Sequence, residues 1–255
     1  MAIVSVKNLH KRFGMQVVLG GISLEIAAGS CVVVLGASGT GKSVLLKHIV
    51  GLLKPDKGQV FFEDKRIDKL PERLLVDVRR NFGFLFQMSA LFDSSSNIDN
   101  VAFPLIEHTR LPRDEIYAIA QQKLEMVGLP DVAQKMPAEL SGGMRKRVAL
   151  ARAIAMNPKV ILYDEPTTGL DPIRSDVINE LILKLQRELQ ITSIVVTHDM
   201  NSAFKVADRL VMLHEGKIRF DGTPEEIRLS EDAVIKRFIT GEAGEQELAS
   251  LMRVR

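Results

Sequence analysis

A glycine-rich segment early in the chain has the spacing of a phosphate-binding loop. The residues that fit GxxxxGK[ST] are Gly36, Ala37, Ser38, Gly39, Thr40, Gly41, Lys42 and Ser43. Glycines let backbone N–H groups turn inward around phosphate oxygens, and a following helix adds the positive end of its dipole. Lys42 can then reach the β- and γ-phosphates, and the Ser43 hydroxyl can ligate Mg²⁺. The alternative, a glycine turn that only joins two elements, is disfavoured because a strand pattern and a helix pattern flank the motif.

Two adjacent acids follow a second apolar run. Asp164 comes directly after Val160–Tyr163, which predicts a carboxylate at the carboxyl end of a strand, where α/β sheets bind ligands. A Mg²⁺ held by substrate phosphates also needs such a carboxylate. Glu165 comes next and is well placed to orient or deprotonate an attacking water. The alternative is that the two acids only cap a strand in solvent.

The elements that must position these residues follow from the hydropathy pattern. The predicted strands are Ile3–Leu9, Ile22–Ile26, Cys31–Leu35, Gln59–Phe62, Val160–Tyr163 and Ser193–Thr197, with a hairpin around Glu215 and Gly216. The predicted helices are 43–50, 113–127, 144–156 and 172–189, with another helix starting at Thr223. Strands that alternate with helices imply an α/β fold with a mainly parallel sheet. Residues 88–156 contain no long β-branched run, so we expect a helical insertion there.

Composition excludes several classes of protein. The 255 residues carry a formal net charge of +2, which argues against a nucleic-acid partner bound by bulk electrostatics. The single cysteine, Cys31, cannot form an internal disulfide, fits a reducing compartment and is expected to be a small core residue. The N-terminus has no apolar signal region, and no apolar stretch approaches the roughly 20 residues that span a bilayer. We therefore expect a soluble chain, which can still be the peripheral subunit of a membrane complex.

Further segments, in order, resemble the ATP-binding cassette (ABC) ATPases over roughly residues 3–240. The matching positions are Phe13 (the aromatic that stacks on adenine), Gln87 (Q-loop), Leu140–Met144 (the signature segment), Asp171 (D-loop) and His198 (switch histidine). Each is weak alone, but their order and contexts make the resemblance specific.

The resemblance implies a fold, cofactors and roles. The fold is a RecA-like P-loop NTPase core (1–87 and 157–240) with an N-terminal antiparallel β part and an inserted α-helical subdomain (88–156). The cofactors are ATP and Mg²⁺. The implied catalytic residues are Glu165, His198 and Gln87, and the implied metal residues are Ser43, Gln87 and Asp164.

The signature segment implies a second chain. In the family, Ser141, Gly142 and Gly143 face the ATP held by the partner subunit, so one phosphate loop and one signature per chain imply a homodimer. Met144 stands where the family usually has glutamine, and a thioether cannot replace the amide's hydrogen bonds. We expect the basic residues Arg145, Lys146 and Arg147 that follow to form a solvated helix face.

Three segments resemble one branch of the family, the cytoplasmic ATPases of bacterial MCE-type lipid transporters of the Mla type. They are Glu139–Ala155, Phe86–Phe92 and Asn100–Leu105. This resemblance implies phospholipid transport from the cytoplasmic face of the inner membrane, with an integral-membrane permease, a periplasmic MCE protein and a small STAS-domain protein. The alternatives are the ATPase of another ABC importer or exporter, a soluble ABC protein, and a regulator that does not hydrolyse ATP.

Two further segments leave alternatives open. The apolar residues Leu91, Phe92, Phe103 and Leu105 show little helical or strand period. They can form a groove behind Gln87 that receives a permease coupling helix, or fill the core of the helical subdomain. The tail, residues 241–255, can be a short helix docked on the other subunit or a frayed end.

Overall fold

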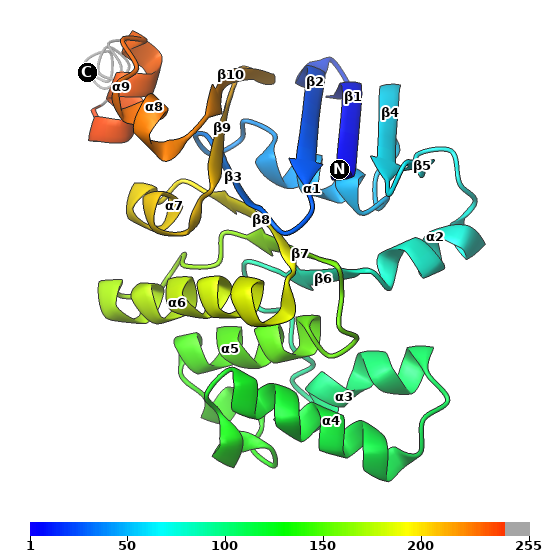
Figure 1. Ribbon diagram of the computed structural model, residues 1–255. Helices are drawn as coiled ribbons and strands as arrows, with labels where there is room; N and C mark the ends of the chain where they lie inside the picture. The colour runs from blue at the N-terminus through cyan, green and yellow to red at the C-terminus, as the bar shows by residue number, and fades with distance from the viewer. Residues whose placement is uncertain (243–255) are drawn as a thin grey trace.

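Two β-sheets and a group of helices make up residues 1–242, the part of the chain that the computed structural model describes (Figure 1). The strands are β1 (Ala2–Phe13), β2 (Gln16–Ala27), β3 (Cys31–Leu35), β4 (Lys57–Phe62), β5 (Lys65–Arg66), β6 (Phe82–Leu85), β7 (Val160–Asp164), β8 (Thr192–Thr197), β9 (Arg209–His214) and β10 (Lys217–Gly222). The helices are α1 (Lys42–Ile49), α2 (Glu72–Arg79), α3 (Asn97–His108), α4 (Arg113–Met126), α5 (Gly142–Ala153), α6 (Pro172–Leu189), α7 (Met200–Val206), α8 (Pro224–Arg228) and α9 (Ala233–Thr240). Short 3₁₀ turns, η1 (Pro130–Val132) and η2 (Pro137–Glu139), precede α5. The predicted α/β fold class is confirmed. Residues 243–255, most of the tail for which the sequence leaves a docked helix or a frayed end open, lie outside the described part.

A mainly parallel sheet forms the centre, in the order β10-β9-β3-β8-β7-β6. Its central strands are short apolar runs buried on both faces, and all of Cys31–Leu35 is buried, as predicted. β7 pairs with β8 so that Asp164 lies opposite Val196, and β3 pairs with β8 so that Leu35 lies opposite Thr197. The parallel register therefore brings the phosphate loop, the acidic pair and His198 to one edge of the sheet.

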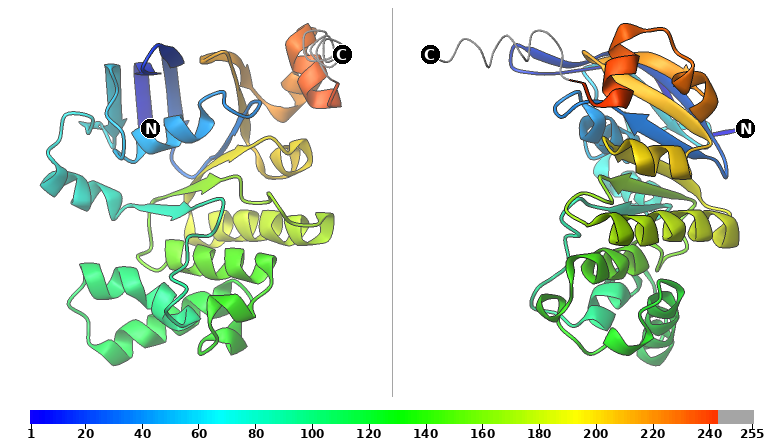
Figure 2. Two further views of the ribbon diagram at one scale, coloured as in Figure 1. Left: turned by 180° about the vertical axis from the view of Figure 1, so that it is seen from behind. Right: turned by 90° about the vertical axis from the view of Figure 1, so that its left-hand side faces the viewer.

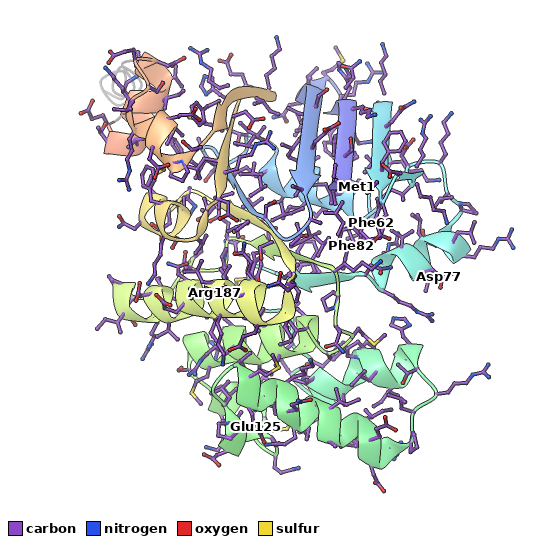
Figure 3. All side chains as sticks on the ribbon, in the orientation of Figure 1. Met1, Phe62, Asp77, Phe82, Glu125 and Arg187 are labelled. Atoms are coloured by element: carbon purple, nitrogen blue, oxygen red, sulfur yellow. The ribbon has the colours of Figure 1, made fainter. Side chains whose placement is uncertain are left out.

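An antiparallel sheet, in the order β2-β1-β4-β5, lies beside the first, as the family resemblance implies. Its strands β1 and β2 are longer than predicted, and bulges interrupt their pairing. The rings of Phe62 in β4 and Phe82 in β6 pack with centroids 4.8 Å apart (Figure 3). This contact joins the antiparallel sheet to the last strand of the parallel one.

Helices α3, α4 and α5 gather at the end of the molecule opposite the antiparallel sheet, in both orientations of Figure 2. They share one hydrophobic core with the neighbouring face of the parallel sheet. No helix within residues 1–242 has both the length and the apolar character needed to cross a membrane.

Helix α3 differs from the sequence-based expectation. Residues 89–105 show little period in the sequence, yet Asn97–His108 is helical in spite of Pro104. The Ser96 side chain caps the helix by accepting from the backbone N–H of Asp99, and buried Asn100 bonds both backbone groups of Phe92. The helical conformation of this segment therefore depends more on local hydrogen bonds than on the spacing of its apolar residues. Helix α2 and strand β6 were also not predicted.

Helix α5 lies directly against the parallel sheet at Gly83. A Cβ at this position would lie 2.5 Å from the carbonyl oxygen of Ala153, a backbone atom that cannot move independently. Only a glycine in β6 lets α5 approach this closely.

We predict that Gly83→Ala destabilises the protein by about 1–3 kcal/mol, the typical cost of overpacking. Gly20→Ala is the matched control, because a Cβ there would meet its nearest atom at an ordinary 3.6 Å. Chemical denaturation of both variants measures the difference. Equal stabilities would show that α5 does not depend on this close approach.

Candidate nucleotide-binding site

A pocket of about 390 Å³ opens at the edge of the sheet where the predicted residues converge. Its walls are Phe13, Val18, Ser38, Gly39, Gly41, Lys42, Ser43, Val44, Gln87, Glu165 and His198. They come from β1, β2, the phosphate loop, α1 and the segments that follow β6, β7 and β8. Residues far apart in the sequence therefore meet in one cavity.

The phosphate loop folds around the Lys42 ammonium. Lys42 Nζ donates to the carbonyl oxygens of Gly36 at 2.7 Å and Ala37 at 3.1 Å. Burial lowers the pKa of Lys42, and the charges of Glu165 and Asp164 act in the opposite direction. The loop enters α1 through Gly41, whose φ of +97° only glycine adopts easily. A cationic side chain and the N-terminus of α1 thus face the same pocket, a suitable combination for phosphate.

Asp164 and Ser43 are in direct contact at the end of this loop. Ser43 Oγ donates to Asp164 Oδ1 at 2.9 Å, and Gln87 lines the same pocket. A hydroxyl, a carboxylate and an amide oxygen are hard donors, and Mg²⁺ typically binds through one or two carboxylates plus substrate phosphates. The residues present therefore fit a Mg²⁺ held mainly by a nucleotide. Burial raises the pKa of Asp164, the Ser43 hydrogen bond lowers it, and the charge of Glu165 raises it further.

Glu165 adopts a backbone conformation that is rare for a residue with a side chain. Its φ is +51°, and its N–H donates to the carbonyl oxygen of Val196 at 2.9 Å. One carboxylate oxygen, Oε2, lies 2.9 Å from His198 Nδ1 and accepts from Thr168 Oγ1 at 3.2 Å. The other, Oε1, lies 3.7 Å from Lys42 Nζ. The carboxylate is therefore held at several points inside the pocket, as a general base needs to be.

Phe13 lies at the rim of the pocket with 48% of its surface exposed. Lys11 Nζ is 5.5 Å from the centroid of its ring. An aromatic ring left this exposed beside a phosphate loop offers a face on which a base can stack.

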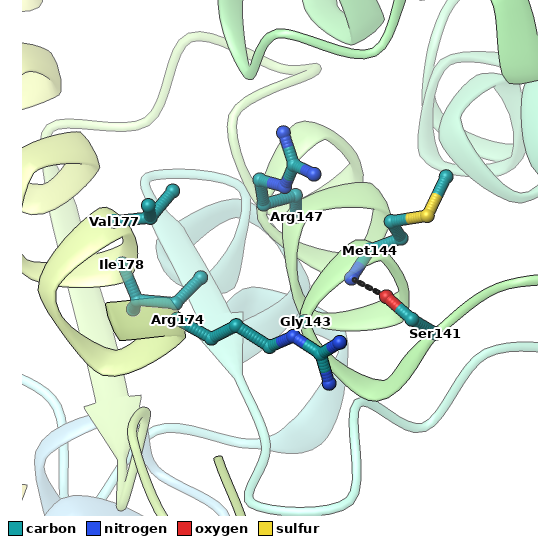
Figure 4. A pocket seen from close by; sticks show the side chains of 7 residues that line it. All are labelled: Ser141, Gly143, Met144, Arg147, Arg174, Val177 and Ile178. Atoms are coloured by element: carbon teal, nitrogen blue, oxygen red, sulfur yellow. Dashed lines mark hydrogen bonds between the residues drawn. The ribbon is translucent and has the colours of Figure 1, made fainter. Parts of the chain in front are cut away.

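The signature segment lies apart from this pocket. Ser141 caps α5 by accepting from the N–H of Met144 at 3.4 Å, and Ser141, Gly143 and Met144 line a separate cavity of about 80 Å³ (Figure 4). Gly142 is the first residue of α5. The rest of the small cavity is formed by Arg147, Arg174, Val177 and Ile178. The chain therefore does not bring its signature residues to its own phosphate loop.

Asp171 caps the neighbouring helix α6. Its carboxylate accepts from the backbone N–H of Arg174 at 2.9 Å, and its other oxygen lies 3.2 Å from Arg174 Nε. Asp171 is thus placed on the signature side of the molecule and is not part of the phosphate pocket.

The prediction that Arg145, Lys146 and Arg147 form a solvated helix face is wrong for two of the three residues. Lys146 is buried, and half-buried Arg147 donates to the carbonyl oxygen of Gly128 at 3.2 Å. Gly143, Lys146 and Leu150 follow the i, i+3, i+7 spacing of a buried helix face, and all three are buried. That spacing was the signal that could have identified Lys146 from the sequence.

Of the apolar residues in 89–105, some lie in the core and others on the surface, so neither the core nor the groove alternative describes all of them. Leu105 is buried in the core, whereas Phe92 and Phe103 are 42% and 41% exposed. Their rings pack edge to face with centroids 4.8 Å apart, and the Arg152 guanidinium lies 5.6 Å from the Phe92 ring. An exposed aromatic pair therefore exists on the surface of the helical part.

Comparison with known proteins gives consistent results. The family model described as ABC transporter matches residues 19–168. The intermembrane phospholipid transport system ATP-binding protein MlaF of Haemophilus influenzae is 44% identical over 94% of this chain and 91% of its own. The probable ribonucleotide transport ATP-binding protein mkl of Mycobacterium leprae is 42% identical over 93% of this chain and 69% of its own. Among solved structures, the dimeric ATP-binding cassette MJ0796 in a post-hydrolysis state with ADP and phosphate superposes with a TM-score of 0.80. It is 36% identical and covers 86% of this chain and 98% of that one.

We predict that Asp164→Asn raises the thermal midpoint of the protein at neutral pH without nucleotide or metal. Because burial places the folded pKa of Asp164 above its unfolded value, the ionised carboxylate opposes folding. The gain should be complete above the folded pKa and shrink as the pH falls towards the unfolded value. Thermal denaturation of both proteins across this range tests the sign, and a lower midpoint for the variant at neutral pH would contradict it.

Proposed function

Because this chain belongs to the ABC transporter family, whose ATPases couple ATP hydrolysis to transport, we propose that it drives phospholipid transport through an MCE-type permease complex, hydrolysing ATP with Glu165 as general base. The single observation that carries the catalytic assignment is the Glu165 carboxylate, held between His198 and Lys42 in the phosphate pocket. The transport assignment rests on relatives named for phospholipid transport.

Each residue of the pocket has a role in this proposal. Phe13 stacks on the base, while the amides of the phosphate loop and Lys42 hold the phosphates. Glu165 accepts the proton of the attacking water, and His198 fixes the carboxylate orientation through the 2.9 Å contact. Ser43, Asp164 and Gln87 would hold Mg²⁺, which when bound supplies positive charge to the phosphate oxygens.

We propose that a complete ATP site contains two copies of this chain. The signature residues Ser141, Gly142 and Gly143 lie outside the phosphate pocket of their own chain, and so does Asp171. A C₂ dimer lets each signature close the ATP site of the other copy. The dimeric solved relative with ADP and phosphate supports this arrangement.

The proposed organisation has one RecA-like core, residues 1–87 and 157–240, and one helical subdomain, residues 88–156. In this scheme the helical subdomain and Gln87 face an integral-membrane permease at the cytoplasmic face of the inner membrane. A periplasmic MCE protein and a small STAS-domain protein complete the complex. Lipids would move to or from the outer membrane.

A second candidate function is transport of another solute. The relative from Mycobacterium leprae is named for ribonucleotide transport at nearly the same identity as the phospholipid relative. Both candidates use the same ATP site, so they differ only in the membrane partner and its cargo.

The catalytic proposal predicts that Glu165→Gln lowers the hydrolysis rate by about 10²–10⁴, the usual contribution of a general base. The affinity for ATP should stay near the wild-type value, because the amide keeps the shape of the side chain. A phosphate-release assay together with nucleotide-binding titration measures both quantities. A variant that retains more than about a tenth of the wild-type rate would exclude Glu165 as the base.

The docking proposal predicts that Phe92→Ala weakens recovery of the permease when the tagged chain is purified from membranes. Phe92 is half of the exposed aromatic pair on the helical part, and such exposed apolar patches mark interaction sites. Leu229→Ala is the matched control, since Leu229 is also exposed but follows the last residue of α8, outside helices α3 to α5. Equal permease recovery from both variants would remove the docking assignment.

The same purification from native membranes identifies the transported class. Mass spectrometry of the bound proteins and lipids is expected to find a permease, an MCE protein and phospholipid. Recovery of another permease without lipid enrichment would replace the phospholipid assignment by transport of another solute and leave the ATP chemistry unchanged.

A further inference from the structure

Helix α5 carries a lysine whose ammonium is buried and bonded to a single turn of backbone. Lys146 is 5% exposed, and its Nζ donates to the carbonyl oxygens of Pro166 at 2.7 Å, Thr168 at 2.9 Å and Glu165 at 3.3 Å. Within residues 1–242, no carboxylate lies within ion-pair distance of this ammonium. The backbone of residues 165–168 therefore supplies its direct hydrogen-bond partners.

Burying a charge in this way costs free energy that an apolar side chain would avoid. Burial lowers the pKa of Lys146 to about 8, although the nearby charge of Glu165 acts in the opposite direction. The three carbonyls offset the cost only while they converge on one point. The ammonium and the turn consequently fix each other's position.

The turn that Lys146 holds is the one that carries Glu165. The positive φ of Glu165 is a strained conformation for a residue with a side chain, and such strain persists only where surrounding contacts enforce it. Lys146 binds the carbonyl oxygen of Glu165, while Thr168 contributes both a carbonyl to Lys146 and a hydroxyl to the Glu165 carboxylate. The direction of the Glu165 carboxylate thus depends on a contact made by Lys146 from helix α5.

The signature residues lie at the N-terminal end of the same helix. Gly142 and Gly143 form the first turn of α5, Ser141 caps it, and Lys146 lies about one turn further along. Because a helix is stiff over such a short length, a displacement of the signature moves Lys146 as well, and with it the turn that carries Glu165.

We propose that Lys146 is a positioning residue that makes the signature end of α5 and the Glu165 turn move as one unit. In the proposed dimer, ATP bound by the partner copy presses on the signature of this chain, and Lys146 transmits that contact to the Glu165 carboxylate at this chain's own ATP. The two ATP sites are thereby coupled through a single side chain. The inference rests on the dimeric ATPase described under the proposed function.

Steady-state kinetics of the full-length protein, purified with its membrane partners, tests this role with Lys146→Met. Methionine keeps the apolar stem and removes the donors, so kcat should fall at least about tenfold, since small misplacements of a catalytic group cost up to about 10²-fold. The KM for ATP should change little, because Lys146 does not line the phosphate pocket. Lys146→Arg, which keeps a cationic donor, should recover part of the lost kcat.

Lys123→Met is the control for a general loss of stability. Lys123 is also 5% exposed in the helical part, but its Nζ donates to Asn157 Oδ1 at 2.7 Å and makes no contact with the Glu165 turn. This variant should keep the wild-type kcat.

A double-mutant cycle with Glu165→Gln completes the test. If Lys146 acts through the carboxylate, Lys146→Met should change the residual rate of the Glu165→Gln protein by less than about twofold. An equal loss in both backgrounds, or a kcat for Lys146→Met no lower than for Lys123→Met, would overturn the inference while leaving the ATPase assignment intact. If Glu165→Gln itself had no effect, the proposed function would be wrong instead.

Discussion

The structure depends on one constraint, which is that the chain must leave strand β7 with the Glu165 carboxylate turned back towards the phosphate loop. An extended residue at this point would continue along the strand direction, whereas the φ of +51° redirects the side chain into the pocket. The neighbouring elements all contribute to this conformation. Strand β8 accepts the Glu165 N–H through Val196, His198 contacts the carboxylate, and α5 binds the carbonyl through Lys146. Parallel pairing of β7 with β8 is what brings these groups together.

A second feature is the distance in the fold between the phosphate pocket and the signature residues of the same chain. The phosphate loop, Glu165 and His198 line one pocket, and Asp164 accepts a hydrogen bond from Ser43 of that pocket. The signature residues and Asp171 lie elsewhere, at the start of α5 and of α6. Helix α5 begins with the neutral cap Ser141, which adds no negative charge at its N-terminus and so suits an anionic ligand, whereas the N-terminus of α6 is already capped by the carboxylate of Asp171. A single copy leaves that surface without a phosphate. Two copies related by a twofold axis supply one phosphate group to each signature, which is why the proposal requires a dimer.

The parts of this arrangement that follow from local chemistry could be predicted from the sequence. Strand β3, helix α6 and the helix start at Thr223 match the expectations, because their signals lie within a few neighbouring residues. Helix α3 could not be predicted in this way, and the burial of Lys146 was signalled only by its helical spacing with Gly143 and Leu150. The caps of α3 and its buried Asn100 outweigh a weak period and an internal proline. Lys146 is stabilised by carbonyls about twenty positions away, and its charge alone suggested solvent.

In the proposed dimer, Glu165 of one copy works with the signature of the other. The most direct measurement is the ATPase rate of a mixture of two inactive proteins, one carrying Glu165→Gln and the other Ser141→Arg. In a mixed dimer, the intact Glu165 of the second protein meets the intact signature of the first, so one site of the two is complete. With random mixing, we expect recovery of about a quarter of the wild-type rate, because about half of the dimers are mixed and each has one working site. A mixture no more active than either protein alone would contradict it.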